Sequence, residues 1–149
     1  MKRNFTYTDM LATFGISSAH PGGSRLTKNI FADEDILPTM KILDLGCGTG
    51  QTSAFLAKKY KCDIISIDQN STMLKKAEKR FEKAGLNIKT IQAKAEKLPF
   101  LEEIFDYIIS ESVIVFTNSN YSLPELCRVL KKTGKLIAIE MISEDVLTS

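Results

Sequence analysis

Several features that often point to a function are scarce in this sequence of 149 residues. It has no tryptophan, three cysteines and a single histidine, His20. The cysteines form no C-x-x-C pair, and with one histidine they argue against a zinc site, so we expect no metal. An odd and sparse set of cysteines favours a reducing compartment.

Long apolar segments and a strong charge of one sign are lacking as well. No run approaches the roughly 20 apolar residues that span a bilayer, and the first residues lack the apolar stretch of a secretory signal. We therefore predict a cytoplasmic protein with no membrane partner. The net charge of +2 is too small to indicate a nucleic-acid partner.

The composition is that of an ordinary globular domain, with 44% hydrophobic and 26% charged residues. Its apolar patterning alternates between the periods of strands and helices. Strands are predicted at residues 41–45, 63–68, 88–92, 105–110 and 135–140. Helices are predicted at 51–60, from 70 or 71 to 85, and from a capping box at Ser122 and Glu125 to residue 130. This alternation predicts an α/β fold with a mainly parallel, doubly wound sheet.

The N-terminal part of the sequence reads differently. Residues 7–14 place apolar side chains on one helical face, a Gly- and Pro-rich loop containing His20 follows, and Ser24 is positioned to cap a second helix that ends near Phe31. We expect residues 1–32 to form a helical lid and residues 33–149 to form the core.

The segment 44–50 carries the clearest motif, an acid followed by glycines at alternate positions. Asp44 ends an apolar strand, and Gly46, Gly48 and Gly50 form the turn into a helix. The dinucleotide pattern G-x-G-x-x-G fails because Gln51 occupies its third glycine position, which disfavours a nicotinamide-dependent oxidoreductase. An acid before the turn would repel a pyrophosphate but suits a ligand that carries an ammonium group.

Residues 42–50, 92–100 and 126–136 together resemble the class I S-adenosylmethionine-dependent methyltransferases, most of all the ubiquinone/menaquinone-biosynthesis (type 11) group. The resemblance implies a Rossmann-like sheet of strand order 3-2-1-4-5 and S-adenosyl-L-methionine as cofactor. The family's sheet usually continues with a further strand pair, whereas this sequence stops nine residues after Glu140. We expect that pair to be missing and the fifth strand to offer an open edge for a homodimer.

The loops that follow the strands hold the expected cofactor-binding residues. Asp68, in the position of a ribose-binding acid, either accepts from a ribose diol or is a turn acid ahead of a helix cap. Asp44 either accepts from the ligand's amino group or holds glycine-turn amides. The resemblance also implies contacts from the glycine turn, at Gly46, Cys47, Gly48 and Gly50. It places Gln69 and Met73 beside the adenine, and it adds Ala95 and Glu96 in the third loop and the carbonyl of Ser110. Lys94 stands where the family commonly has an acid, so it cannot accept from the adenine amino group.

The predicted function is methyl transfer to a small-molecule acceptor. No Asn/Asp-Pro-Pro-Tyr or Pro-Cys motif follows the fourth strand, and these would suggest methylation of nucleic-acid bases. Tyr7, His20 and Glu111 are candidate general bases, needed only if the acceptor must lose a proton. The alternative is a non-catalytic, cofactor-binding subunit or fragment that acts through association.

Overall fold

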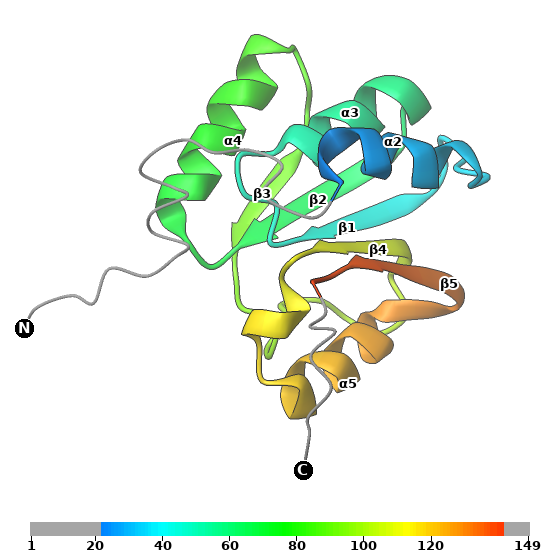
Figure 1. Cartoon of the computed structure of the whole chain (residues 1–149), viewed down its shortest axis with the longest axis vertical. Helices are drawn as coiled ribbons and strands as arrows, with labels where there is room; N and C mark the ends of the chain where they lie inside the picture. The colour runs from blue at the N-terminus through cyan, green and yellow to red at the C-terminus, as the bar shows by residue number, and fades with distance from the viewer. Residues whose placement is uncertain (1–21, 142–149) are drawn as a thin grey trace, which may run out of the picture.

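The computed structural model describes residues 22–141. The predicted helix at 7–14, and with it Tyr7 and His20, lie outside these described residues. The elements in chain order are α2 (Gly23–Ala32), β1 (Lys41–Leu45), α3 (Gln51–Tyr60), β2 (Asp63–Asp68), α4 (Ser71–Lys83), β3 (Lys89–Gln92), β4 (Phe105–Glu111), the 3-10 helix η1 (Ile114–Phe116), α5 (Ser119–Val129) and β5 (Leu130–Ile139) (Figure 1).

The five strands form one sheet of order β3-β2-β1-β4-β5, in which every neighbouring pair is parallel. This confirms the predicted doubly wound fold and its strand order. The order turns back between β1 and β4, and ligands of such sheets bind at the carboxyl ends of the strands near that point. None of the helices within residues 22–141 combines the length and apolar character that crossing a bilayer requires.

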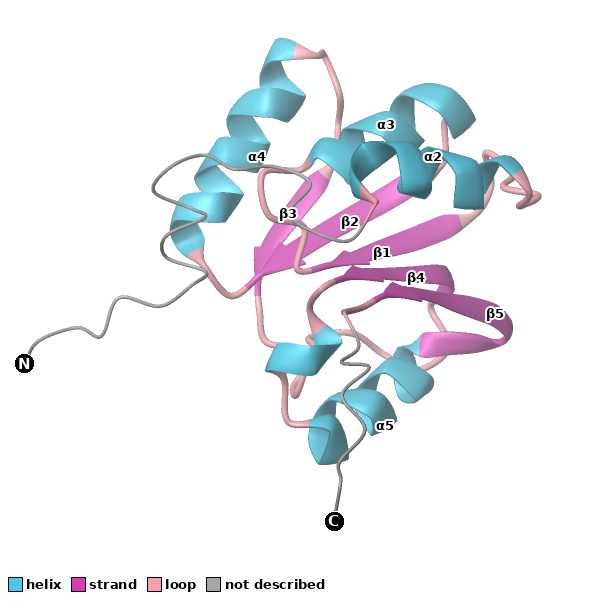
Figure 2. Cartoon of the chain, in the orientation of Figure 1, coloured by secondary structure: helices cyan, strands magenta, loops and turns pink. Residues whose placement is uncertain are grey.

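Helices cover both faces of the sheet, with α2, α3 and α4 on one side and α5 on the other (Figure 2). Side chains of successive strand residues point to opposite faces of the sheet, so each central strand contributes side chains to the core on both faces. Ile42 packs with Phe31 of α2 and Leu56 of α3, whereas Leu43 packs with Leu126 of α5. Burial on both faces explains why β4 is almost continuously apolar.

Two predicted helix starts are wrong. The helix α5 begins at Ser119, where Asn118 caps it by accepting from the Asn120 N–H at 3.2 Å. The hydroxyl of Ser122 is engaged with that of Thr117 at 2.7 Å, and Glu125 binds Arg128 and the Leu98 N–H, so neither residue forms the expected capping box. Likewise α2 begins after Gly22 with no side-chain cap, so Ser24 does not cap it.

The end of α5 and the start of β5 also differ from the prediction. The helix stops at Val129, and the strand begins at once with Leu130, which lies beside Phe105. The register then slips, because Tyr107 of β4 pairs with Lys135. Gly134 therefore lies within an irregular part of the strand, and an added Cβ there would lie 3.0 Å from the Asp106 carbonyl oxygen.

Candidate cofactor-binding site

The glycine turn joins β1 to α3 at the carboxyl ends of the strands. Gly46, Gly48 and Gly50 all have φ between 56° and 79°, which L side chains rarely adopt. The Cys47 N–H donates to the Ile67 carbonyl at 2.8 Å, and the Gly50 N–H donates to the Cys47 carbonyl at 3.0 Å. Burial and the nearby carboxylates raise the pKa of the Cys47 thiol, so that side chain stays neutral.

The three glycines serve different purposes. A Cβ on Gly46 would lie 2.5 Å from Val113, and one on Gly50 would lie 2.6 Å from Phe81, so these two glycines permit close packing. Nothing lies within 4 Å of a Cβ placed on Gly48. The turn is therefore open at Gly48, which is where a ligand can approach the main chain.

Asp68 connects the glycine turn to the neighbouring loop. Its carboxylate accepts from the Gly48 N–H at 3.0 Å and from the Asn70 N–H at 2.9 Å. Asn70 in turn caps α4 by accepting from the Thr72 and Met73 N–H groups. Burial raises the pKa of Asp68, and the backbone hydrogen bonds of Asn70, Gly48 and Gln69 lower it. One alternative for Asp44 is that it binds amides of the glycine turn. In the structure Asp68 is the residue that binds such an amide, the N–H of Gly48.

Asp44 lies beneath the turn, with only 3% of its surface exposed. It accepts from the Ser53 hydroxyl at 2.5 Å, and Ser53 also bonds the hydroxyl of Ser66 at 2.7 Å. Because Ser53 donates to Asp44, Ser66 is the donor in the second bond. Burial, followed by the charge of Glu111, raises the pKa of Asp44 to about 7, although the Ser53 bond lowers it. Asp44 therefore binds the first turn of α3 and not the glycine amides.

Glu111 ends β4 and holds two helices together. Its carboxylate accepts from the Thr27 hydroxyl of α2 at 3.0 Å and from the Thr52 hydroxyl of α3 at 3.0 and 3.1 Å. The charges of Glu111 and Asp68 both act on Asp44. We call Asp44, Asp68 and Glu111 the acidic cluster, because the other two carboxylates act electrostatically on Asp44 and Asp68 also binds the glycine turn.

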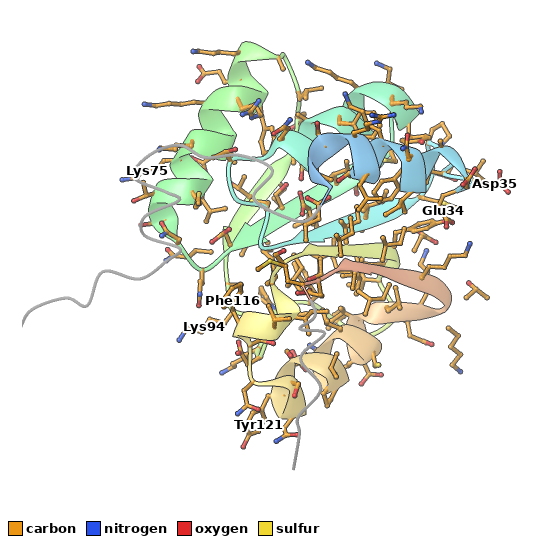
Figure 3. All side chains as sticks on the ribbon, viewed as in Figure 1. Glu34, Asp35, Lys75, Lys94, Phe116 and Tyr121 are labelled. Carbon is orange, nitrogen blue, oxygen red and sulfur yellow. The ribbon has the colours of Figure 1, made fainter. Side chains whose placement is uncertain are left out.

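The positions expected beside the adenine are spread along the loops after β2 and β3. Gln69 is exposed, and its carbonyl accepts from the Gln92 side chain at 3.0 Å. The Met73 and Ala95 side chains are buried, each with 6% exposed. Glu96 accepts from the Asn118 N–H at 3.0 Å, which connects this loop to α5. Lys94 is exposed on the outside of the same loop (Figure 3).

Ser110 is fully buried near the end of β4, where its hydroxyl donates to Glu140 at 3.2 Å. Sequence reasoning missed the part that Glu140 plays. Its carboxylate also accepts from the N–H groups of Val113, Ile114 and Val115, at 3.4, 3.1 and 3.5 Å. It thereby holds the start of η1 over Gly46. The sequence signal that could have indicated this role is the position of Glu140, an acid directly after the fifth strand.

The residues present fit a ligand that carries positive charge and a diol. The acidic cluster provides carboxyl groups for a positively charged group, the Asp68 carboxylate provides acceptors at the second strand end, and Gly48 leaves the main chain accessible. Among residues 22–141, no group of three or more His, Cys, Asp or Glu side chains is placed to hold a metal ion.

Comparison with known proteins decides the family. A methyltransferase-domain model matches residues 42–134. The chain belongs to the class I S-adenosylmethionine-dependent methyltransferase family. An uncharacterized methyltransferase, YodH of Bacillus subtilis, is 45% identical over 134 residues, covering 90% of this chain and 57% of the relative. A ubiquinone/menaquinone biosynthesis C-methyltransferase of Wigglesworthia glossinidia brevipalpis is 40% identical over 125 residues, covering 80% and 50%.

A solved structure supports the same assignment. A candidate S-adenosyl-L-methionine-dependent methyltransferase from Methanococcus maripaludis matches with a TM-score of 0.77 and 25% identity, covering 93% of this chain and 65% of that one. S-Adenosyl-L-methionine is the cofactor of the family, in agreement with the charge and openness of the site. The chain spans about half the length of the curated relatives it matches, 57% and 50% for the two named above.

Proposed function

We propose that this protein transfers a methyl group from S-adenosyl-L-methionine to a small organic acceptor. The observation that carries the proposal is the open main chain of Gly48, whose N–H donates to the Asp68 carboxylate at 3.0 Å, with Asp44 and Glu111 as the other members of the acidic cluster. The cofactor has a sulfonium and an ammonium group, and opposite charges within a few ångströms stabilise each other strongly in a partly buried site.

The residues of this chain contribute binding and orientation. The bound cofactor supplies an activated methyl group, so no protein nucleophile is needed. In this proposal Asp68 binds the ribose diol and the turn at Gly48 binds the amino-acid portion. Holding the reactants in line accounts for much of the catalysis in such a reaction. Both oxygens of Glu111 accept from threonine hydroxyls, so we propose that it positions α2 and α3 and assign no general base.

A small acceptor is favoured over a nucleic acid by two observations. The net charge of +2 is small for a protein that neutralises a phosphate backbone. Relatives named as ubiquinone/menaquinone biosynthesis C-methyltransferases are 37–40% identical to this chain. An aromatic or quinone-like ring carbon is therefore the first acceptor to test.

The test separates cofactor binding from turnover. Calorimetric titration should show S-adenosylhomocysteine binding and no binding of NAD. An assay with methyl-labelled cofactor and a panel of quinols, phenols, amines and carboxylic acids should then show label in an organic product. Tighter binding of NAD would overturn the family assignment of this site, whereas cofactor binding without any labelled product would favour the second candidate function.

The second candidate is a cofactor-binding, non-catalytic role through association, favoured by the free edge of β5. In the part of the chain that the structure describes, β5 pairs with β4 on one side and no strand lies on the other. Leu136 and Met141 are 38% and 57% exposed on or beside that strand. An unpaired strand edge offers N–H and C=O groups to another chain, and we propose a homodimer formed through it.

Light scattering of the protein as it elutes from a size-exclusion column measures this association directly. A dimer that becomes a monomer when Ile137 is replaced by proline supports pairing through β5, because proline removes a backbone donor from the strand. The control is Ile88→Pro, which adds a proline immediately before β3, at the opposite edge of the sheet. A monomeric wild type at all concentrations excludes the dimer.

A further inference from the structure

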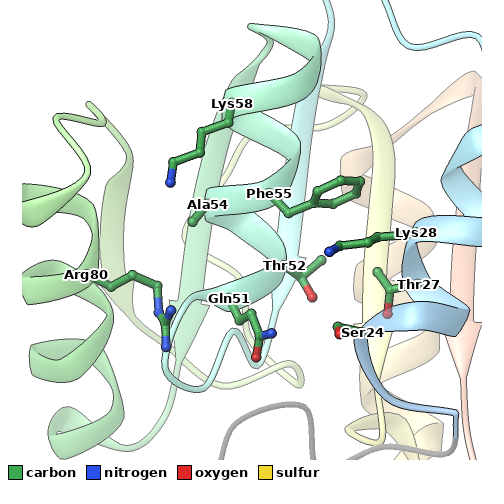
Figure 4. A pocket seen from close by; sticks show the side chains of 9 residues that line it. All are labelled: Ser24, Thr27, Lys28, Gln51, Thr52, Ala54, Phe55, Lys58 and Arg80. Atoms are coloured by element: carbon green, nitrogen blue, oxygen red, sulfur yellow. The ribbon is translucent and has the colours of Figure 1, made fainter.

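A pocket of about 210 Å³ opens on the helical face formed by α2, α3 and α4, next to the glycine turn. Figure 4 shows α3 as its floor, with side chains of α2 and α4 reaching in from the two sides. None of Asp44, Gly48 or Asp68 lines it. The wall nearest the cofactor site is formed by Thr27 and Thr52, whose hydroxyls point to Glu111.

The charge of the pocket has one sign. Lys28, Lys58 and Arg80 come from three different helices, and no aspartate or glutamate is among the lining residues. None of the three cations makes an ion pair with a carboxylate in residues 22–141. All three side chains are exposed around one pocket, and an anionic ligand there would be attracted by their charges.

Two of these cations are held in place by contacts. The Lys28 ammonium lies 5.6 Å from the centre of the Phe55 ring, a cation–π contact. Arg80 donates through Nε to the Thr49 carbonyl at 2.9 Å, which leaves its terminal nitrogens for another acceptor. A guanidinium anchored in this way suits the paired oxygens of a phosphate group.

We infer that this pocket is a second binding site, specific for a phosphate or diphosphate group, formed by Lys28, Lys58 and Arg80. Its volume is below the roughly 300–1,000 Å³ of sites for drug-sized molecules, so it accommodates a small anionic group better than a whole cofactor. Ser24, which also lines the pocket, offers a neutral hydroxyl to such an anion.

The experiment is a calorimetric titration of the full chain with inorganic diphosphate at fixed ionic strength. It is carried out in the presence of saturating S-adenosylhomocysteine. We expect diphosphate still to bind when S-adenosylhomocysteine is present, because none of Asp44, Gly48 and Asp68 lines the pocket. Diphosphate that binds only without S-adenosylhomocysteine would place the anion in the cofactor site and overturn the inference, and so would an absence of binding at millimolar diphosphate.

A pair of matched variants tests the location. Lys28→Gln combined with Lys58→Gln should weaken diphosphate binding at least tenfold. Lys79→Gln combined with Lys83→Gln removes the same charge from exposed positions of α4 outside the pocket and should change it less than twofold. Arg80 is left intact because it also holds the glycine turn. Equal losses in both double variants would indicate general charge attraction and overturn the site, provided circular dichroism shows that both variants fold.

Discussion

Replacing Asp44 by asparagine should stabilise the free protein while weakening its binding of the cofactor product. The side chain is almost fully buried and its pKa is raised from 3.8 to about 7, mainly by burial. At about 1.36 kcal/mol per pKa unit, keeping it ionised in the fold costs at most about 4 kcal/mol. Asparagine has nearly the same shape, carries no charge and still offers an oxygen to the Ser53 hydroxyl.

The pH dependence of this effect has a definite sign. The unfolded chain releases the Asp44 proton near pH 4, whereas the folded protein keeps it until about pH 7. The wild type therefore loses stability as the pH rises through this window and loses no more above it. The free energy of unfolding of Asp44→Asn, relative to wild type, should rise by about 1–2.5 kcal/mol from pH 5 to pH 8.

Urea denaturation at the two pH values measures this difference. Asp33→Asn is the control for removing a carboxylate, because Asp33 is exposed at the end of α2. Calorimetry at pH 8 should show S-adenosylhomocysteine bound about 1.5–3 kcal/mol more weakly by Asp44→Asn, since an interaction with a charged group is lost. A variant that is destabilised equally at pH 5 and pH 8 would refute the reasoning, because Asp44 would then be a stabilising carboxylate.

Three further substitutions test the rest of the site. Asp68→Ala should weaken S-adenosylhomocysteine binding by about 1.5–3 kcal/mol in calorimetry with the fold retained, and unchanged affinity would remove Asp68 from the site. Gly48→Val should abolish binding, because it strains a turn with φ of 56° and fills the open approach, so normal binding would leave the glycine a packing role alone. Glu140→Gln should speed hydrogen exchange at the amides of 113–115 by at least tenfold, and unaltered exchange would contradict its role in holding η1.

The central part of the fold could be predicted because its signals are local. The bounds of β1, α3 and β2 match the prediction, since apolar strands alternate with helices and the glycines mark the turn between them. The start of α5 could not be predicted in this way, because Asn118 and Ser122 are four positions apart and both are residues that commonly cap helices. The choice between them depends on Thr117 and on the partners of Glu125, which are tertiary contacts.

Some residues of the candidate site could be predicted from the sequence and others could not. Asp44, Asp68 and the glycines follow from their places after β1 and β2, as parallel strands bring their carboxyl ends to one edge of the sheet. The hydroxyls of Thr27 and Thr52 that meet Glu111 lie 84 and 59 positions away in the sequence. No periodicity links such distant residues, so a single sequence does not reveal that the acid ties two helices together.

Three hydrogen bonds from other parts of the chain fix the glycine turn. Its Cys47 N–H is bound by Ile67, its Gly48 N–H by Asp68 and its Thr49 carbonyl by Arg80. Fixing the backbone of one free residue costs about 1–2 kcal/mol of conformational entropy. A turn fixed by contacts within the protein imposes little of that cost on binding. Affinity at this site should therefore show a small entropy penalty, and the selection of ligands should depend on charge and shape rather than on how readily the main chain rearranges.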